Sequence, residues 1–194
     1  MMTRLERLTR DGLDPEQREL FDQIASGERA SRNPNVSRVG PDGALEGPFN
    51  AMLRSARLGL ALQEVGAQVR FHSSLSDRCR ELAILIVATA EQSTYERYVH
   101  EQVGRSAGLT DDEMAAVRTG ADPGLGDPVE RAVLATVWAL ANHRDLDDTE
   151  FREAVGVLGE RATYELLALV GYYQLLALSL RVFRVTPPEV PAGL

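Results

Sequence analysis

The 194-residue sequence contains no lysine, because all 21 of its basic residues are arginine. Schiff-base chemistry, anchoring of pyridoxal phosphate and a phosphate-binding P-loop all depend on a lysine amine, so this chain carries none of them. It also contains a single cysteine, Cys79. One cysteine can form neither an internal disulfide bond nor a multi-cysteine metal cluster. These absences exclude several common kinds of enzyme.

An excess of basic charge is missing as well. The 29 acidic residues give a net charge of −8, so we expect neither a nucleic-acid-binding surface nor a polybasic patch for anionic lipid. The residues after Met1 include Arg4 and Glu6 without the apolar stretch of a secretory signal. The nearly apolar runs at 82–90 and 166–178 are shorter than the roughly 18–20 residues of a membrane span. We therefore predict a cytoplasmic protein without nucleic-acid or membrane partners.

What the sequence does contain is a regular series of helix start signals. Asp14-Pro15 with Gln17 combines an N-cap residue, a first-turn proline and a capping-box partner, and Gly27 offers an end about three turns later. Similar signals are Thr110 with Glu113, Asp127-Pro128 with Glu130, and Asp147 with Glu150. No repeat and no convincing strand pattern is present. The pattern predicts a single all-α domain, residues 1–194, of about seven or eight helices.

Apolar residues recur at helical spacing between these signals. Three stripes are predicted to be buried: Leu58, Leu62, Val65 and Val69; Val129, Val133, Val137 and Leu140; and Phe151, Ala154, Val155 and Leu158. The segment 28–48 differs, because it holds the turn pairs Asn33-Pro34, Gly40-Pro41, Asp42-Gly43 and Gly47-Pro48. It predicts a long irregular connection, of a kind that often has a function or wraps around a partner subunit.

Two stretches are too apolar for an ordinary surface helix. No charged residue interrupts 82–90, and Gln174 is the only strongly polar residue of 166–178. A helix that is apolar all round must be covered on all sides. We therefore expect part of the cover to come from another subunit of a homo-oligomer.

Glu96 and His100 are the most informative polar residues. On a helix with 100° per residue they lie in the same apolar stripe as Val99 and Val103. An acid and an imidazole four residues apart are costly to bury unless they pair or take part in chemistry. Two structural alternatives stay open. Ser93 and Glu96 also fit a capping box, and His100 could be a core histidine hydrogen-bonded to Glu96.

Glu81 resembles these two residues, because it shares a helix face with Ile84 and Leu85 at the edge of the most apolar run. If its helix and the next one pack as an antiparallel hairpin, Glu81, Glu96 and His100 meet in one semi-buried pocket. Burial and like-charge repulsion would raise the pKa of the carboxyls there, which suits general acid–base catalysis.

Neither a metal nor a nucleotide cofactor has a visible binding site. The three histidines are dispersed and lack the H-E-x-x-H pattern of zinc enzymes. His72 and His143 fall at predicted helix ends, where a cation complements the helix dipole. No glycine-rich phosphate loop follows a strand. We expect no metal and no cofactor.

Four short motifs, taken in order, resemble the carboxymuconolactone decarboxylase family, which includes the alkylhydroperoxidase D-like (AhpD-like) proteins. They are Gly47-Pro48-Phe49-Asn50 with Met52-Leu53, Arg80-Glu81-Leu82-Ala83-Ile84-Leu85, Tyr95-Glu96 with His100, and Ala107-Gly108-Leu109-Thr110. They span residues 47 to about 120, and the apolar stretch 163–185 is similar to the family's final helix. The resemblance implies an all-helical subunit that forms trimers or hexamers, with active sites near the subunit contacts.

In the peroxidase branch of this family a C-x-x-C pair opens the motif helix. By the resemblance, Ser93 and Glu96 match the two cysteines, Tyr95 matches the intervening histidine, and His100 and Glu81 match the supporting histidine and glutamate. A dithiol peroxidase needs an attacking thiolate and a resolving thiol. Ser93 and Glu96 supply neither, and Cys79 lies outside the motif without a partner. We therefore do not expect thiol peroxidase activity, and the chain is more similar to the decarboxylase branch.

The resemblance then implies a cofactor-free lyase or decarboxylase, with a role in degrading aromatic compounds, that acts on a small carboxylated lactone or related enolisable acid. Such a reaction releases carbon dioxide, and the enzyme must stabilise an oxyanion and deliver a proton to carbon. We assign acid–base or oxyanion-stabilising work to His100, proton relay or orientation to Glu96, and tuning of the pair to Glu81. Candidate substrate-binding residues are Ser93, Tyr95, Phe49 and Asn50, with Arg78, Arg80 or Arg97 as the cation for an anionic substrate. The alternative is a non-catalytic oligomeric protein of the same fold that binds a small molecule.

Overall fold

The computed structural model describes residues 3–32 and 36–188. Within them the chain is helical, with two isolated antiparallel bridges and no longer strand pairing. The helices are α1 (Pro15–Ser26), α2 (Glu28–Arg32), α3 (Phe49–Met52), α4 (Ala56–Phe71), α5 (Asp77–Ala90), α6 (Thr94–Ser106), α7 (Asp111–Thr119), α8 (Pro128–His143) and α9 (Asp148–Phe183). Apart from the short α2 and α3, the described helices have nine or more residues. The predicted all-α fold is confirmed.

The predicted cap residues begin their helices. Capping boxes form at three of these starts, with Asp14, Thr110 and Asp147 as the N-caps, and the Asp127 side chain accepts hydrogen bonds from two N–H groups of the first turn of α8. Gly27 ends α1 as expected. Inside α9 the backbone of Gly159 is not helical (φ 81°, ψ 160°), so α9 consists of two helical pieces that meet at a kink.

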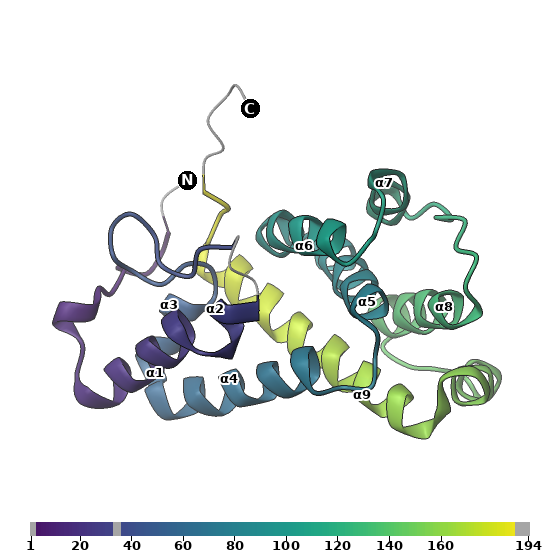
Figure 1. The fold of residues 1–194 in the computed structure, drawn as a ribbon, viewed down its shortest axis with the longest axis horizontal. Coiled ribbons are helices and arrows are strands. Elements are labelled where there is room, and N and C mark those ends of the chain that lie inside the picture. Colours follow the sequence, from purple (N-terminus) through teal and green to yellow (C-terminus); the bar gives the residue numbers. More distant parts are fainter. Residues whose placement is uncertain (1–2, 33–35, 189–194) are drawn as a thin grey trace.

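The centre of the molecule is α5. It packs against α6, α7, α8 and α9, and every residue from 82 to 88 is buried. Figure 1 shows α1 to α4 on one side and α5 to α8 on the other, with α9 running past both groups. Other helices of the same chain therefore cover residues 82–88 of the stretch 82–90, so no cover from a second subunit is needed there.

One side of α9 keeps apolar residues at the surface. Leu167, Leu175 and Leu178 are 50%, 43% and 47% exposed, whereas Leu166 and Leu169 are fully buried. By length and composition alone α9 could cross a membrane. However, six of its buried residues belong to the main hydrophobic core (Leu166, Leu169, Val170, Tyr172, Tyr173 and Leu176), so in this fold it is a core helix.

The apolar stripe predicted for α4 is turned partly outward, since Leu58 is 59% and Val65 is 44% exposed. The buried face of α4 instead consists largely of small and polar residues, Ala56, Gly59, Gln63, Gly66 and Arg70, beside Val69. A Cβ on Gly59 would lie 2.4 Å from a side-chain carbon of Leu20. The prediction is wrong for Leu58 and Val65, because α4 approaches its neighbours too closely for large side chains, whereas Val69 is buried as predicted.

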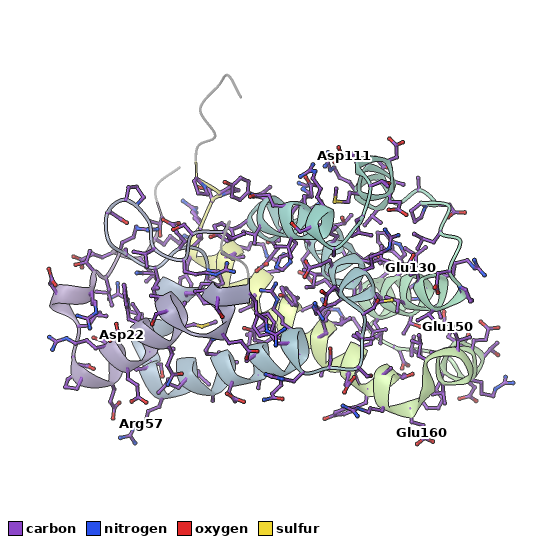
Figure 2. The ribbon with its side chains drawn as sticks, viewed as in Figure 1. Asp22, Arg57, Asp111, Glu130, Glu150 and Glu160 are labelled. Carbon is purple, nitrogen blue, oxygen red and sulfur yellow. The ribbon has the colours of Figure 1, made fainter. Side chains whose placement is uncertain are left out.

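The other two predicted stripes are buried in part. In α8, Val133, Val137 and Leu140 are buried, and Val129 is 40% exposed. In the first piece of α9 only Ala154 is fully buried, while Phe151 is 52% exposed. Polar side chains such as Arg57, Asp111 and Glu160 project from the outside of the molecule (Figure 2).

The segment expected to be irregular, 28–48, is more ordered than predicted. It begins with α2, and residues 38–46 form a hairpin in which Glu46 N–H donates to the Arg38 carbonyl and Gly40 N–H donates to Ala44. The Arg7 guanidinium binds Asp42 and Glu46 of this hairpin. The predicted turn Asn33-Pro34 lies outside the described residues.

Candidate functional site

The site is built on the hairpin of α5 and α6, which pack against each other as expected. Ser93 is the N-cap of α6, and its side chain accepts a hydrogen bond from Glu96 N–H at 3.5 Å. The cap fixes where α6 begins and so sets the direction of the side chains in its first turns. Tyr95, Glu96, Val99 and His100 are thereby buried.

His100 lies between two glutamates. Its Nδ1 is 2.6 Å from Oε2 of Glu81 on α5, and its Nε2 is 3.4 Å from Oε2 of Glu96 one helical turn earlier. His100, Glu81 and Glu96 are only 3%, 1% and 4% exposed, respectively. The structure thus brings together the three residues predicted to be catalytic. We refer to Glu81, Glu96 and His100 as the Glu–His–Glu cluster.

A buried arginine that we did not predict completes the cluster. Arg70 of α4 is 3% exposed, and its Nη2 lies 3.6 Å from Oε1 of Glu81. Burying a guanidinium is costly unless negative charge compensates it, and Glu81 and Glu96 both attract Arg70. The missed signal was the spacing of Ala56, Gly59, Gln63, Gly66 and Arg70, because small residues three and four apart mark a closely packed helix face.

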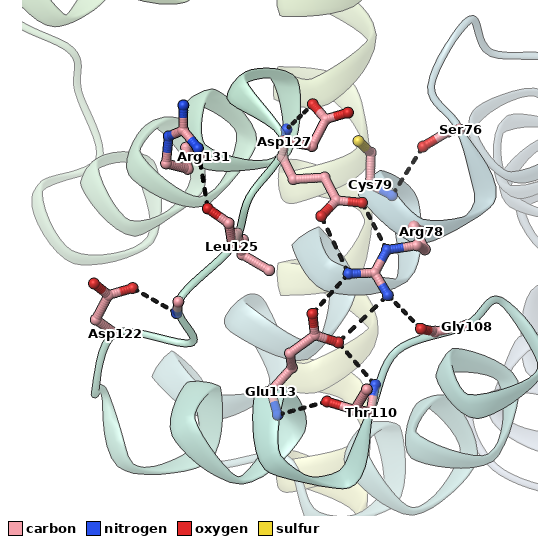
Figure 3. Close-up of polar contacts among 12 residues, drawn as sticks. Ser76, Arg78, Cys79, Gly108, Thr110, Glu113, Asp122, Leu125, Asp127 and Arg131 are labelled. Atoms are coloured by element: carbon pink, nitrogen blue, oxygen red, sulfur yellow. Dashed lines mark hydrogen bonds and ion pairs between the residues drawn. The ribbon is translucent and has the colours of Figure 1, made fainter.

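Of the arginines expected to bind an anionic substrate, Arg78 is occupied by other contacts. Figure 3 shows Arg78 bound to Glu113 and to the Gly108 carbonyl. Its Nε also pairs with Glu130 of α8. These bonds to two carboxylates hold the pKa of Arg78 above its ordinary value, and they join α5 to α7 and α8. Arg80 borders the cluster, with Nε 4.0 Å from Oε1 of Glu81.

The electrostatic balance differs from the expected rise in carboxyl pKa. Burial alone would raise the pKa of Glu81, but the interaction with His100 and the charges of Arg70 and Arg80 outweigh it, so the pKa of Glu81 lies below its ordinary value. For Glu81 the prediction is therefore wrong. The pKa of His100 is also lowered, because burial outweighs the attraction of Glu81.

The short distance between Nδ1 and Glu81 favours one tautomer of a neutral imidazole. An ionised Glu81 accepts the Nδ1–H of His100, which leaves the lone pair of Nε2 directed toward Glu96. An unprotonated Nε2 and an ionised carboxylate would place two acceptors against each other. A proton held on the Glu96 carboxyl would remove this conflict, and at this distance it could pass between the carboxyl and Nε2.

A cavity of about 20 Å³ adjoins the cluster, which is room for about one water molecule. Glu96, His100 and Arg70 line it, together with Phe49 and Tyr95 of the predicted substrate-binding residues. It is also lined by Arg38, Glu46 and Tyr173, which we did not predict. Burial raises the pKa of Tyr95, so its hydroxyl remains a donor.

The other two predicted substrate-binding residues do not line this cavity. Ser93 caps α6, as described above. Asn50 accepts a hydrogen bond from Leu8 N–H and donates one to the Leu8 carbonyl, so it holds the N-terminal segment against α3. Arg97 is likewise not among the residues that line it.

Neither a metal site nor a reactive thiol is found in the part of the chain that the structure describes. No group of three or more His, Cys, Asp or Glu residues there is placed to hold a metal ion. Cys79, which Figure 3 shows beside Ser76, is 3% exposed, and burial raises the pKa of its thiol. A buried thiol with a raised pKa is a poor nucleophile.

Comparison with known proteins finds a family that matches part of the chain. The model of the carboxymuconolactone decarboxylase family matches residues 56–137, the segment that contains Arg70 and the Glu–His–Glu cluster. Comparison with curated proteins finds none that matches the chain.

Several solved structures share the fold. One is the alkylhydroperoxidase AhpD core of an uncharacterized peroxidase-related protein from Ralstonia eutropha JMP134, with a TM-score of 0.75 at 13% identity over 97% of this chain and 94% of that chain. Another is the debrominase Bmp8, solved alone and, as a cysteine-to-alanine variant, with 2,3,4-tribromopyrrole (TM-score 0.72, 17% identity, 97% and 94% covered). A protein of unknown function from Agrobacterium tumefaciens has a TM-score of 0.65 at 17% identity, with 74% of this chain and 100% of that chain covered. At these identities the likeness shows the fold alone.

Proposed function

The chain belongs to the carboxymuconolactone decarboxylase and AhpD-like superfamily, and we propose that it is a cofactor-free lyase of the decarboxylase kind. Its substrate would be a small carboxylated lactone or a related enolisable acid. The observation that carries the proposal is the Glu–His–Glu cluster, with His100 held 2.6 Å from Glu81 and 3.4 Å from Glu96 beside a buried arginine.

Arg70 would supply the electrostatic part of the reaction. When the substrate carboxylate leaves as carbon dioxide, the electron pair of the broken carbon–carbon bond moves into the conjugated carbonyl and forms an enolate. A fixed guanidinium in a water-poor site stabilises such an oxyanion more than water does. Arg70 fits this role because it is buried, always charged and lines the cavity beside the cluster.

The proton for the enolate carbon would come from the one shared by His100 and Glu96. After its transfer, a proton from solvent restores the pair, so each turnover consumes one proton and releases one carbon dioxide. Glu81 would act through His100 rather than on the substrate, because its carboxylate fixes the Nδ1–H tautomer and directs Nε2 toward Glu96. Glu81 is therefore a positioning residue in this scheme.

The cavity must widen before a lactone can bind, since about 20 Å³ holds no more than about one water. Arg38, Glu46 and Pro48, from the 38–46 hairpin and the residues just after it, line this cavity. Movement of this hairpin would therefore open it. The debrominase complex supports the proposal in one respect, because it shows a small five-membered ring bound by a protein of this fold.

We also propose that the protein works as a homo-oligomer, such as a trimer or hexamer. The support is the apolar surface that the chain itself leaves uncovered, at Leu167, Leu175 and Leu178 of α9 and at Leu58 and Val65 of α4. Single exposed apolar residues are ordinary, whereas several on one helix side favour an interface.

The proposed function is tested by following the ultraviolet absorbance of a carboxymuconolactone-type substrate together with carbon dioxide release. The variants are His100→Asn and, as a matched control, His143→Asn, which changes an exposed histidine at the end of α8. We expect kcat to fall by roughly 10²–10⁴-fold in His100→Asn and to stay unchanged in His143→Asn.

Turnover that survives His100→Asn would reject the assigned site. If the wild-type protein binds the substrate without turnover, and His100→Asn binds it equally well, the non-catalytic binding protein replaces the lyase as the better account.

A further inference from the structure

Glu81 and Arg70 also line a second and much larger cavity, which we call the outer cavity. Its volume is about 300 Å³, compared with about 20 Å³ for the cavity beside His100. It lies at the N-terminal turn of α5, with walls from Arg32 of α2, Arg70 and Phe71 of α4, and the C-terminal part of α6. A volume of this size suits a small organic molecule.

Polar atoms at the outer cavity have no hydrogen-bond partner among the described residues. They are Nε of Arg70, Nε of Arg80 and Oε1 of Glu81, and all three are buried. Arg70 approaches Oε1 of Glu81 only to 3.6 Å and Arg80 only to 4.0 Å, beyond the range of a good hydrogen bond. Buried donors of this kind are costly to leave unpaired, and the acceptor between them, Oε1 of Glu81, lies too far from both guanidiniums to satisfy them.

The charges around the outer cavity specify the kind of acceptor. Three arginines (Arg32, Arg70 and Arg80) and two acids (Asp77 and Glu81) line the cavity. Arg80 also pairs with Asp77, and Arg32 pairs with Glu28. Carboxylates of the chain thus already balance the arginines, so a monoanion is repelled less there than a dianion such as phosphate. A carboxylate matches the planar donor fork of arginine.

The rest of the outer cavity favours an apolar body on that carboxylate. The ring of Phe71 forms part of the wall, with the guanidiniums of Arg32 and Arg70 5.3 Å and 5.2 Å from its centre. These cation–π contacts hold the ring in place, so that an apolar or aromatic group can lie beside it.

We propose that the outer cavity binds a small monocarboxylate with an apolar body, whose carboxylate bridges Arg70 and Arg80. Such a ligand would lie next to Oε1 of Glu81, whose other oxygen contacts His100. A bound ligand would therefore affect the Glu–His–Glu cluster through the side chain of Glu81. This binding is independent of the reaction proposed above, because it needs no turnover.

The test is isothermal titration calorimetry of the full chain with benzoate. Benzamide is the neutral isostere and inorganic phosphate is the dianionic probe. We expect benzoate to bind at millimolar or lower concentration and benzamide not to bind. Loss of a charge-assisted hydrogen bond in Arg80→Gln weakens benzoate binding by about tenfold or more. The matched control Arg97→Gln, on α6 but outside the cavity lining, changes it less than about twofold.

Because Arg80 is partly buried, Arg80→Gln could lose benzoate binding through misfolding, so a second variant at an exposed position is also measured. Arg32→Gln, at the exposed end of α2, should also weaken benzoate binding, and both variants are checked by their Tm. In the wild type, benzoate should shift the ring resonances of His100 more than those of His143. The proposal is overturned if benzoate does not bind, if benzamide binds equally well, if phosphate binds more tightly, or if Arg97→Gln weakens binding as much as Arg80→Gln.

Discussion

Replacing Glu81 by glutamine should destabilise the protein more than any comparable surface change. Glu81 is 1% exposed and lies 2.6 Å from His100 and 3.6 Å from Arg70. Glutamine has nearly the same shape and its amide oxygen can still accept the Nδ1–H of His100. What the variant removes is the negative charge, so the test isolates the electrostatic part of the interaction.

The magnitude follows from the charge that is left behind. Arg70 is 3% exposed, and in Glu81→Gln it stays buried without its nearest counter-charge. Removing one partner of a buried ion pair costs about 3–5 kcal/mol of unfolding free energy, out of a total of roughly 5–15 kcal/mol. In a chain of this size each kcal/mol lowers Tm by about 2–4 °C, which corresponds to a fall of roughly 6–20 °C.

Urea and thermal unfolding followed by circular dichroism measure this change. The matched control is Glu101→Gln, which removes the same charge from a pair with the partly exposed Arg118 and should cost about 1 kcal/mol or less. Adding Arg70→Met to Glu81→Gln should restore part of the loss, because no orphaned charge remains. If Glu81→Gln lowers the free energy of unfolding no more than Glu101→Gln does, the description of a charged buried cluster is refuted.

Two further predictions concern pH and backbone strain. Because burial holds the pKa of His100 below its ordinary value of 6.5, the unfolded chain binds a proton there that the native chain does not. The free energy of unfolding should therefore fall as pH drops below about 6.5, by up to about 1.4 kcal/mol per pH unit from this group. Between about pH 7 and pH 5, Tm should fall less steeply in His100→Asn than in the wild type. Equal slopes in the two proteins would contradict this prediction. Gly47→Ala should lower the free energy of unfolding in urea by roughly 1–3 kcal/mol, because Gly47 has φ +62° and a Cβ there would lie 2.5 Å from the Tyr95 ring. Gly43→Ala is the control, since Gly43 has φ +76° but open space around it, and it should cost less. An equal cost would mean that backbone strain alone acts, without the contact to Tyr95.

The helix boundaries could be predicted from the sequence because caps are local chemistry. The side chain of Asp14 or Thr110 satisfies backbone groups three residues away, so the signal and its effect lie in the same short segment. The meeting of Glu96 and His100 follows from helical spacing in the same way. Placing Glu81 beside them needed only one further assumption, that consecutive helices form a hairpin.

Arg70 and the cover of α5 could not be predicted, because both depend on contacts between distant segments. Helical periodicity shows that one face is apolar, but it does not show which element packs on it. In α4 close packing at Gly59 reverses the simple rule and leaves Leu58 and Val65 outside. Arg70 is then buried because Glu81 and Glu96, on two other helices, provide its counter-charges.

The two motif positions that hold cysteines in the peroxidase branch have separate roles in this chain. Ser93 caps α6 and so keeps the frame of the motif helix. Glu96, one turn before His100, brings a carboxylate to 3.4 Å from Nε2. A pair of thiols exchanges electrons, whereas a carboxylate and an imidazole at this distance exchange a proton. With Cys79 buried and without a second thiol, the same helical frame is therefore suited to moving protons rather than electrons.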